Sequence, residues 1–394
     1  MIITYSLDQL PAGDVDFFCD MISYISPMIE QSTRKDTVLE ITCADENEAA
    51  VRESLKQLYD MITAGKLSGE EIKIKTLADH TDAVSSNSAP IFQEMLDSGC
   101  IRKMCSGVYA YSGLFLKIFR YFDRKIAAFG AELFPHAEEY EFPVLYPVKD
   151  YEKGKYFETF PHHIMFQTNM KQDLGVLNRF AENGIKDESI LEEMKTPENV
   201  LRHAACVPVY ALVENQTIPD DQPRCFLISG KCFRNEADNV FELARLNEFY
   251  MKEYVFIGSP DYCKRSIEAS KRIWKFWTET FGLNCKVDTA NDSFFASNYK
   301  KLKLFQVLGQ SKQEFKVQLP ASGMYVACGS ANHHRTHFSK PYQIHAEHDA
   351  LCYTACFAFG VERLAYTFLA QKGLDISKWD QATREEIEKY VDLT

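Results

Sequence analysis

The sequence predicts an α+β protein in which a mainly antiparallel sheet is flanked by helices, preceded by a small α+β domain. Three strand-like runs lie in the second half of the chain, at 225–233, 315–319 and 324–328. They are not separated by a regular alternation of strand and helix, and no Gly-rich phosphate loop follows them, so a doubly wound parallel sheet is not expected. With 394 residues, the chain can form one large core and a small appended domain.

Two amphipathic helices are expected to cover this sheet. Their apolar residues recur at helical spacing: Leu114, Ile118, Phe122 and Ile126 in the first helix, and Ile273, Trp277 and Phe281 in the second. The first pattern stops at Gly130 and the second at Gly282. Because glycine commonly follows the last helical turn, both helices are predicted to end at these residues.

Residues 1–80 are predicted to form the small N-terminal domain. Its expected elements are strands at 2–7, 38–43 and 71–77 and a helix with a common apolar face of Val51, Leu55, Leu58 and Ile62. A polar stretch of small residues follows and ends in Pro90, which is typical of a linker. We therefore predict a linker at 81–94 and a large domain over 95–394.

Composition excludes several classes of protein. The start of the chain lacks the basic region and apolar run of a secretion signal, and the 12 cysteines include no close pairs of the zinc-ribbon kind, so a soluble cytoplasmic protein with reduced thiols is expected. No membrane association is expected. The formal net charge of -12 argues against tRNA as a partner, because binding to a polyanion requires clustered Lys and Arg.

The chemistry is predicted by three segments in a fixed order, at 232–236, 245–253 and 358–364. They read Cys-Phe-Arg-Asn-Glu, Arg-Leu-Asn-Glu-Phe-Tyr-Met-Lys-Glu and Ala-Phe-Gly-Val-Glu-Arg-Leu. Together they resemble motifs 2 and 3 of the class II aminoacyl-tRNA synthetases. This resemblance implies the class II catalytic core as the fold of the large domain and ATP as a substrate.

The resemblance assigns a role in ATP binding to five residues. Attack of a carboxylate on the α-phosphate brings two anions together, so fixed cations must hold both. Arg234 would bind the α-phosphate and the amino acid carboxylate, and Arg363 the γ-phosphate, because a guanidinium binds such oxygens in bidentate fashion. These two are the expected catalytic residues. Phe249 would stack on adenine, Glu236 would accept from its amino group, and Arg245 would cover the other face or bind the γ-phosphate.

A structural alternative exists for the same residues. Arg234 with Glu236 and Arg363 with Glu362 could form surface ion pairs, and Phe249 could belong to the core. The order and spacing of the three segments favour the active-site interpretation.

A narrower resemblance covers roughly residues 95–394. It rests on the runs at 107–115, 160–162, 290–295, 328–334 and 373–379. These runs resemble the amino acid:[carrier protein] ligases, which are similar to the catalytic core of methanogen-type seryl-tRNA synthetases and lack its tRNA-binding domain. The N-terminal domain is not covered by the resemblance.

That resemblance implies a zinc ion at the catalytic site that recognises the substrate's amino group. The matching ligands are Cys206, Glu253 and Cys356. Two thiolates and one carboxylate leave a fourth coordination position open, which is the arrangement of a zinc that binds a ligand. The alternative is that these cysteines are core residues, as scattered cysteines usually are.

Four histidines suggest a second metal site, but a different interpretation is preferred. His333 and His337 are four residues apart, and His345 and His348 follow. They lie among Ser, Gly, Asn and Thr in a predicted strand and loop, where spacing of four does not align two imidazoles. In the resembling family this segment lines the amino acid pocket, so Ser330 and Asn332 are predicted to bind the amino acid. An ordinary polar loop remains the alternative for His334 and His337.

One departure from the family concerns Mg²⁺, the cofactor expected with ATP. A family strand that presents a carboxylate to Mg²⁺ aligns with residues 314–319, and the best register places Lys316 at that position. The neighbouring strand offers Met324 and Tyr325 instead of an acid. A shift of two residues would place Glu314 on the same strand face; otherwise, either metal handling is altered or ATP turnover is weak.

The predicted function is a two-step ligation. ATP and a small amino acid such as glycine, alanine or serine would give an aminoacyl-adenylate, and the phosphopantetheine thiol of a carrier protein would then accept the aminoacyl group. The alternatives are a seryl-tRNA-synthetase-like enzyme that charges tRNA, and a catalytically weakened binding or regulatory module. A C2 homodimer is also expected, through the helix that stops at Gly130 and the strand at 141–147.

Overall fold

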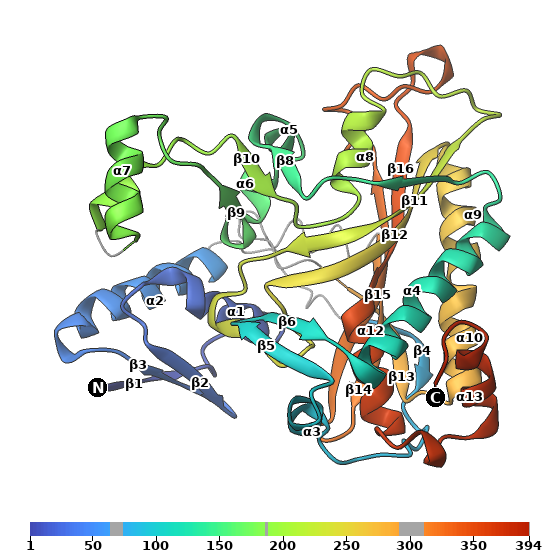
Figure 1. The fold of residues 1–394 in the computed structure, drawn as a ribbon, viewed down its shortest axis with the longest axis horizontal. Coiled ribbons are helices and arrows are strands. Elements are labelled where there is room, and N and C mark those ends of the chain that lie inside the picture. Colours follow the sequence, from blue (N-terminus) through green and yellow to red (C-terminus); the bar gives the residue numbers. More distant parts are fainter. Residues whose placement is uncertain (64–73, 186–187, 291–310, 394) are drawn as a thin grey trace.

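The computed structural model describes residues 1–63, 74–185, 188–290 and 311–393, which form a small N-terminal domain and a large domain (Figure 1). Two predictions fall partly outside these residues: the beginning of the strand expected at 71–77, and the run at 291–295. No helix in the described ranges is both long and apolar enough to span a membrane.

The N-terminal domain is a three-stranded antiparallel sheet covered by two helices. Its strands follow the order β1-β3-β2, with β1 at Ile2–Ser6, β2 at Gln31–Lys35 and β3 at Val38–Thr42. The helices are α1 (Val15–Ile25) and α2 (Glu48–Thr63). All four α2 residues predicted to share an apolar face are buried in a core of their own, together with side chains of α1 and the sheet.

The large domain is built on an eight-stranded sheet of order β4-β13-β14-β15-β16-β12-β11-β7. Its strands are β4 (Thr76–His80), β7 (Glu138–Glu141), β11 (Arg224–Phe233), β12 (Glu248–Gly258), β13 (Cys285–Thr289), β14 (Lys312–Leu319), β15 (Met324–Arg335) and β16 (Tyr353–Gly360). All neighbouring strands run antiparallel except β7 and β11, which are parallel. The predicted α+β class and the mainly antiparallel sheet are therefore confirmed.

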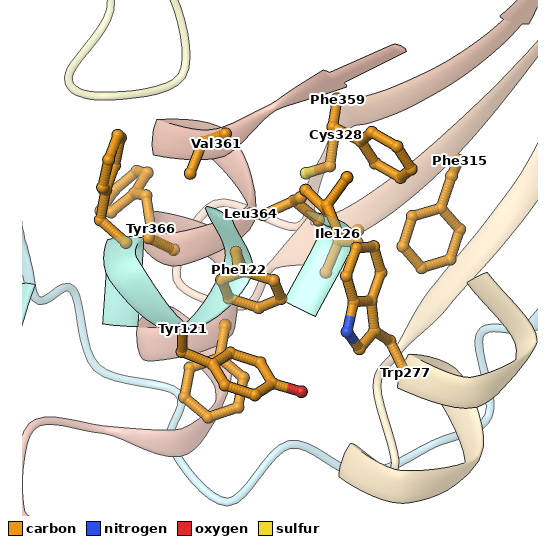
Figure 2. Packing of buried hydrophobic residues seen from close by; sticks show 14 of the residues in the cluster. Tyr121, Phe122, Ile126, Trp277, Phe315, Cys328, Phe359, Val361, Leu364 and Tyr366 are labelled. Carbon is orange, nitrogen blue, oxygen red and sulfur yellow. The ribbon is translucent and has the colours of Figure 1, made fainter. Parts of the chain in front are cut away.

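One face of the sheet is covered by helices. These are α4 (Gly113–Leu133), α9 (Pro260–Ser270), α10 (Arg272–Phe281), α12 (Val361–Lys372) and α13 (Gln381–Glu388). Figure 2 shows the interior of this layer, where aromatic and aliphatic side chains of α4, α10 and α12 pack against Phe315 and Phe359 of the sheet. The ring of Phe122 lies 5.2 Å from that of Trp277, centroid to centroid. Because the helices bury this face, polar side chains of the strands can contact a ligand only on the opposite face of the sheet.

Shorter elements cover part of the opposite face. They include the small sheet β8-β10-β9, with β8 at Leu145–Pro147, β9 at Met165–Gln167 and β10 at Asn199–Leu201, and the helices α5 (Val148–Lys153), α6 (Tyr156–Thr159) and α8 (Val207–Leu212). The helix α7 (Leu174–Asn183) lies to one side, away from the large sheet (Figure 1). Before α4 come α3 (Phe92–Asp97) and the hairpin of β5 (Ile101–Cys105) and β6 (Val108–Tyr111). These elements leave part of the sheet open as a pocket.

The structure differs from the prediction at the domain boundary. β4 pairs with β13, so residues 76–80 form the edge strand of the large sheet instead of a strand of the N-terminal domain. Most β4 side chains are exposed. Because such a strand buries little of its surface, its sequence pattern cannot indicate which sheet it joins.

The two predicted helix ends have different outcomes. Gly282 follows α10 with a φ of 58°, so this C-terminus is confirmed. α4 instead continues past Gly130 to Leu133. A Cβ atom at Gly130 would lie 2.6 Å from Cε1 of Tyr254 on the sheet, so this glycine allows close packing of helix and sheet and does not end the helix.

Candidate active site

The site is positioned by the alternation of side chains along β12. Tyr254 and Phe256 belong to the core under the helices, whereas Phe249, Met251 and Glu253 line a pocket on the opposite face. Alternate residues of a strand lie on the same face, so the register of β12 places its odd-numbered residues on the face of the pocket and its even-numbered residues on the face covered by helices.

The pocket has a volume of about 680 Å³ and contains every residue predicted from the sequence to bind ATP, amino acid or metal. These residues are Cys206, Arg234, Glu236, Arg245, Phe249, Glu253, Ser330, Asn332, Cys356 and Arg363. They come from α8 and its N-terminus, from the β11–β12 hairpin, from β15 and β16, and from the first turn of α12. Residues more than 150 positions apart in the sequence thus share one cavity.

Three of these residues form a compact group of metal-ligand type. The sulfur atoms of Cys206 and Cys356 and a carboxylate oxygen of Glu253 all lie within 4.8 Å of one another, and all three residues are buried. Oε1 of Glu253 accepts hydrogen bonds from the backbone N–H groups of Ala205, at 3.0 Å, and Cys206, at 3.1 Å. These bonds fix the carboxylate next to the two thiols.

The donor set fits a zinc ion. Zinc binds thiolate sulfur at about 2.3 Å, which places two sulfurs about 3.8 Å apart in a tetrahedral site, and this spacing is compatible with separations of at most 4.8 Å here. Without a cation, burial of the two thiols and the carboxyl group next to one another disfavours their negatively charged forms. The hydrogen bond with Cys356 and then burial raise the pKa of Cys206 well above its usual value, and burial raises the pKa of Glu253. A divalent cation would reverse this penalty.

A polar shell surrounds Cys356. Nδ2 of Asn332 donates to the Cys356 sulfur at 3.4 Å and to Oγ of Ser330 at 3.0 Å, so the two residues predicted to bind the amino acid contact each other beside the metal-ligand group. Nε2 of His334 lies 3.6 Å from the same sulfur, and its Nδ1 lies 3.3 Å from the hydroxyl of Tyr210. This shell holds Cys356 in one orientation.

Arg234 lies at the start of the loop between β11 and β12. Its backbone N–H donates to the carbonyl of Asn247 at 3.0 Å, and its Nε donates to the carbonyl of His203 at 3.2 Å. The guanidinium carbon lies 5.1 Å from the centroid of the Phe249 ring. Arg234 and Phe249 are therefore stacked against each other. A nucleotide base that stacks on Phe249 would replace or share this contact.

Arg363 is the third residue of α12 and connects two other segments. Its Nε donates to the carbonyl of Ala244 at 2.6 Å, and its Nη1 donates to the carbonyl of Ala327 at 3.0 Å. Burial, and after it the positive charge of Arg234, lowers the pKa of Arg363. Two guanidinium groups thus lie close enough to repel each other, an arrangement that an anion between them would stabilise.

Arg245 is held between two carboxylates. Nε donates to Oε2 of Glu236 at 2.9 Å, while Nη1 and Nη2 donate to the two carboxylate oxygens of Asp20 at 3.0 and 3.1 Å. Burial opposes its charge, but the hydrogen bond with Asp20 and the charge of Glu236 outweigh burial and raise the pKa of Arg245. Asp20 belongs to α1 of the N-terminal domain. Nothing in the sequence pattern indicated this contribution.

The strand predicted to present a carboxylate to Mg²⁺ places Glu314, not Lys316, in the lining of the pocket. Glu314 lies 3.2 Å from Nζ of Lys312 and 3.6 Å from Nζ of Lys316. Lys316 also lies 3.4 Å from Asp288. Glu314 is thus on the side expected from a shift of two residues, but both of its neighbours on that face of the strand are cations.

The histidines do not form a second metal group among the described residues. His333 lies on β15, which continues to Arg335, so His333 and His337 are not on one face of a helix. Both line the pocket. Burial lowers the pKa of each. His345 and His348 do not line the pocket.

The fold of the large domain is that of a class II tRNA synthetase core. Residues 191–372 match the family described as tRNA synthetase class II core domain (G, H, P, S and T). A crystal structure of A. aeolicus tRNASec in complex with M. kandleri SerRS has a similar fold, with a TM-score of 0.70 over 98% of this chain and 77% of that chain at 20% sequence identity. The chain therefore contains the class II core that the motifs predicted.

Within this class, the chain resembles two kinds of ligase. It is 29% identical over 288 residues to "Amino acid--[acyl-carrier-protein] ligase 1" of Bradyrhizobium diazoefficiens, which covers 71% of this chain and 84% of that protein. It is also 29% identical over 266 residues to "Type-2 serine--tRNA ligase" of Methanocaldococcus jannaschii, but this match spans only 51% of that protein. The predicted resemblance is confirmed by these comparisons.

Glu362 is a buried carboxyl group at the edge of the pocket. Both of its oxygens accept from the backbone N–H of Tyr250 at 2.9 Å, and Nζ of Lys231 lies 3.8 Å away. Burial, only partly offset by Lys231, raises its pKa from 4.5 to about 7. The folded protein therefore binds a proton here more tightly than the unfolded chain does.

This shift predicts a pH-dependent difference between the wild type and Glu362→Gln. Below about pH 4.5 the carboxyl is protonated in both the folded and the unfolded protein, and its contribution to the free energy of unfolding is fully present. This contribution is lost as the pH rises through 7. The free energy of unfolding of the wild type should fall relative to that of the Gln variant by about 3 kcal/mol between pH 4 and 8. Denaturant titrations of both proteins measure the difference. If the difference in free energy of unfolding between the two proteins does not change with pH, the pKa of Glu362 is not raised in the folded protein.

Proposed function

We propose that this protein activates a small amino acid with ATP and transfers the aminoacyl group to the phosphopantetheine thiol of a carrier protein. One observation carries the proposal: the group of Cys206, Glu253 and Cys356 lies in the same pocket as Arg234 and Arg363. An amine-binding metal beside two anion-binding cations suits a substrate that has both an amino group and a carboxylate.

In the first step, a carboxylate oxygen of the amino acid attacks the α-phosphorus of ATP and pyrophosphate leaves. Arg234 would hold the carboxylate and the α-phosphate together, and Arg363 would bind the γ-phosphate, where their charges offset those of the two anions. Phe249 would stack on adenine, and Glu236 would accept from its amino group. Since Glu236 and Arg245 are already paired, this part of the site is ordered before the nucleotide binds.

Cys206, Glu253 and Cys356 would hold a zinc ion whose open coordination position binds the substrate amine. Asn332 would keep Cys356 oriented, and Ser330 would border the substrate. An amine fixed at a buried metal leaves little depth for a side chain. The proposed substrates are therefore small amino acids of the glycine, alanine or serine class.

In the second step, the thiol sulfur attacks the adenylate carbonyl and AMP leaves, so a thioester replaces a mixed anhydride. The carrier protein is favoured as acceptor because the ligase relative matches over 84% of its length, whereas about half of the serine–tRNA ligase relative lies outside the match. The formal net charge of -12 also opposes binding of a polyanion.

Magnesium would enter this reaction with ATP. Of the pocket carboxylates, Glu314 lies between two lysines and Glu236 is paired with Arg245. A metal bound by the phosphates, with Lys312 nearby as a fixed cation, therefore requires less rearrangement than a metal held by a free pair of carboxylates.

A C2 homodimer remains a prediction from the resemblance. The helix expected to mediate it is α4. The strand expected at 141–147 is not one strand: Glu141 ends β7 of the large sheet, and residues 145–147 form β8 of the small sheet. Sedimentation of the full chain, giving the mass of two copies or of one, decides this point.

The adenylation step predicts that radioactive pyrophosphate exchanges into ATP only when one small amino acid is present. Arg234→Ala should lower kcat/KM for this exchange by about 100- to 1,000-fold, the effect of removing a group that binds charge developing in the transition state. Arg265→Ala is the matched control, because Arg265 is exposed on α9 and does not line the pocket.

Exchange with none of the twenty amino acids would contradict the proposal. ATP binding without such exchange would instead support the binding-module alternative. An Arg234→Ala variant with unchanged exchange would show that the arginine does not act on the phosphate.

Metal content provides a second prediction. The purified protein should contain about one zinc per chain, and Cys206→Ala and Cys356→Ala should each lose it along with amino-acid-dependent exchange, because two remaining ligands bind zinc weakly. Cys352→Ala should retain zinc, since Cys352 is buried near β16 but lies outside the metal-ligand group. Elemental analysis measures the content; full zinc retention in both variants would reject the site.

The acceptor is tested separately. A phosphopantetheinylated carrier protein should gain the mass of one aminoacyl group in a bond that hydroxylamine cleaves, as expected for a thioester, and bulk tRNA should not be charged in the same assay. Charging of tRNA at moderate salt, without transfer to the carrier, would replace this proposal with the seryl-tRNA-synthetase alternative.

A further inference from the structure

The N-terminal domain contacts the loop that carries the adenine-binding residues. In Figure 1, α1 lies beside the loop between β11 and β12. The hydroxyl of Tyr24 on α1 donates to the carbonyl of Asn235 at 2.9 Å, and Nδ2 of Asn239 donates to the carbonyl of Asp20 at 2.9 Å. The loop is thus anchored to a helix that lies more than 200 residues earlier in the chain.

The strongest of these contacts joins Asp20 to Arg245. Both carboxylate oxygens of Asp20 accept from the two terminal nitrogens of the guanidinium, at 3.0 and 3.1 Å. The side chains are only 33% and 29% exposed, so water screens the pair less than it would at a free surface. A two-point contact of this kind fixes the plane of the guanidinium as well as its position.

The orientation of Arg245 determines which carboxylate oxygen of Glu236 can still accept a hydrogen bond from a ligand. With its terminal nitrogens directed at Asp20, Arg245 contacts Glu236 through Nε alone, at Oε2. Among the described residues, no side chain donates to Oε1 of Glu236. Without Asp20, the guanidinium could turn and take both oxygens of Glu236 in a bidentate pair.

We propose that Asp20 is a positioning residue of the nucleotide site: by holding Arg245, it leaves one oxygen of Glu236 able to accept from the adenine amino group. The N-terminal domain, which no motif assigns to a function, thereby completes the recognition of adenine. This inference rests on the proposed function, because it presupposes that ATP binds in the pocket.

In a competing interpretation, the contact between Asp20 and Arg245 weakens the binding of ATP. If Arg245 had to leave Asp20 to reach a phosphate, the carboxylate would compete with ATP, and removing it would tighten binding. The positioning role predicts weaker binding and poorer discrimination of the base. The sign of the change in ATP affinity therefore separates the two.

The test compares Asp20→Asn with Asp16→Asn in the full-length chain. Asp16 lies on the same helix, and its 91% exposed side chain pairs with Arg34 of the N-terminal domain. Titration calorimetry with ATP and with GTP, each with Mg²⁺, should show an about tenfold higher Kd for ATP in Asp20→Asn. The preference for ATP over GTP should fall by a similar factor, because GTP has no amino group at the position that Glu236 reads.

Two further readouts exclude a merely structural effect. In pyrophosphate exchange, the KM for ATP should rise in Asp20→Asn while the KM for the amino acid stays within about twofold, because the contact lies at the adenine end. In an Arg245→Lys background, Asp20→Asn should add little, since the effect passes through Arg245. Should Asp20→Asn fail to fold, Asp20→Glu keeps the charge and should give a smaller rise in the same Kd.

Unchanged or tighter ATP binding in Asp20→Asn overturns the inference, as does an equal loss for ATP and GTP. A wild-type protein that binds no ATP overturns the proposed function instead, so the two failures can be distinguished.

Discussion

The register of four antiparallel strands, β11, β12, β16 and β15, is the constraint on which the site depends. Ile228 pairs with Glu253, Glu253 with Ala358, and Asn332 with Cys356 across these strands. A shift of one residue in any of them would turn its polar residues into the helix-covered core and its apolar residues into the pocket. The aromatic core of Figure 2 therefore stabilises the fold and also determines which side chains can meet a substrate.

The three arginines of the pocket are all held in place by hydrogen bonds, but only one of them is neutralised by carboxylates. Arg234 and Arg363 donate to backbone carbonyls of His203, Ala244 and Ala327, which hold them in place without cancelling their charge. Arg245, in contrast, is held by two carboxylates. This difference separates the two ends of the proposed ATP site: the phosphate end has free positive charge, whereas the adenine end has a neutralised, preorganised surface.

Much of this could be predicted from the sequence, because the relevant signals are local. Phe249 and Glu253 have the same parity on one strand, so the period of two already places them on one face. The fold class followed from the absence of a βαβ rhythm, and the apolar faces of α2, α4 and α10 are buried as their spacing indicated.

The remaining features depend on contacts between distant segments. Gly130 reads as a helix end, but the neighbouring ring of Tyr254 is the reason for a glycine there. The exposed strand β4 carries no pattern that indicates its partner, and Asp20 is one of two acids on an amphipathic helix until Arg245 is placed beside it. His334 likewise acquires its role only through its distance to the sulfur of Cys356.

We propose that one pocket binds a zinc ion through two sulfurs and one carboxylate and uses the open coordination position of the zinc for an amine. X-ray absorption at the zinc edge, recorded with and without the amino acid that supports pyrophosphate exchange, measures this coordination. We expect two sulfur neighbours at about 2.3 Å and two oxygen or nitrogen neighbours at about 2.0 Å, with an altered light-atom shell and unchanged sulfur shell when the amino acid is added. A shell of four sulfurs, or a spectrum that the amino acid leaves unchanged, would contradict the proposal.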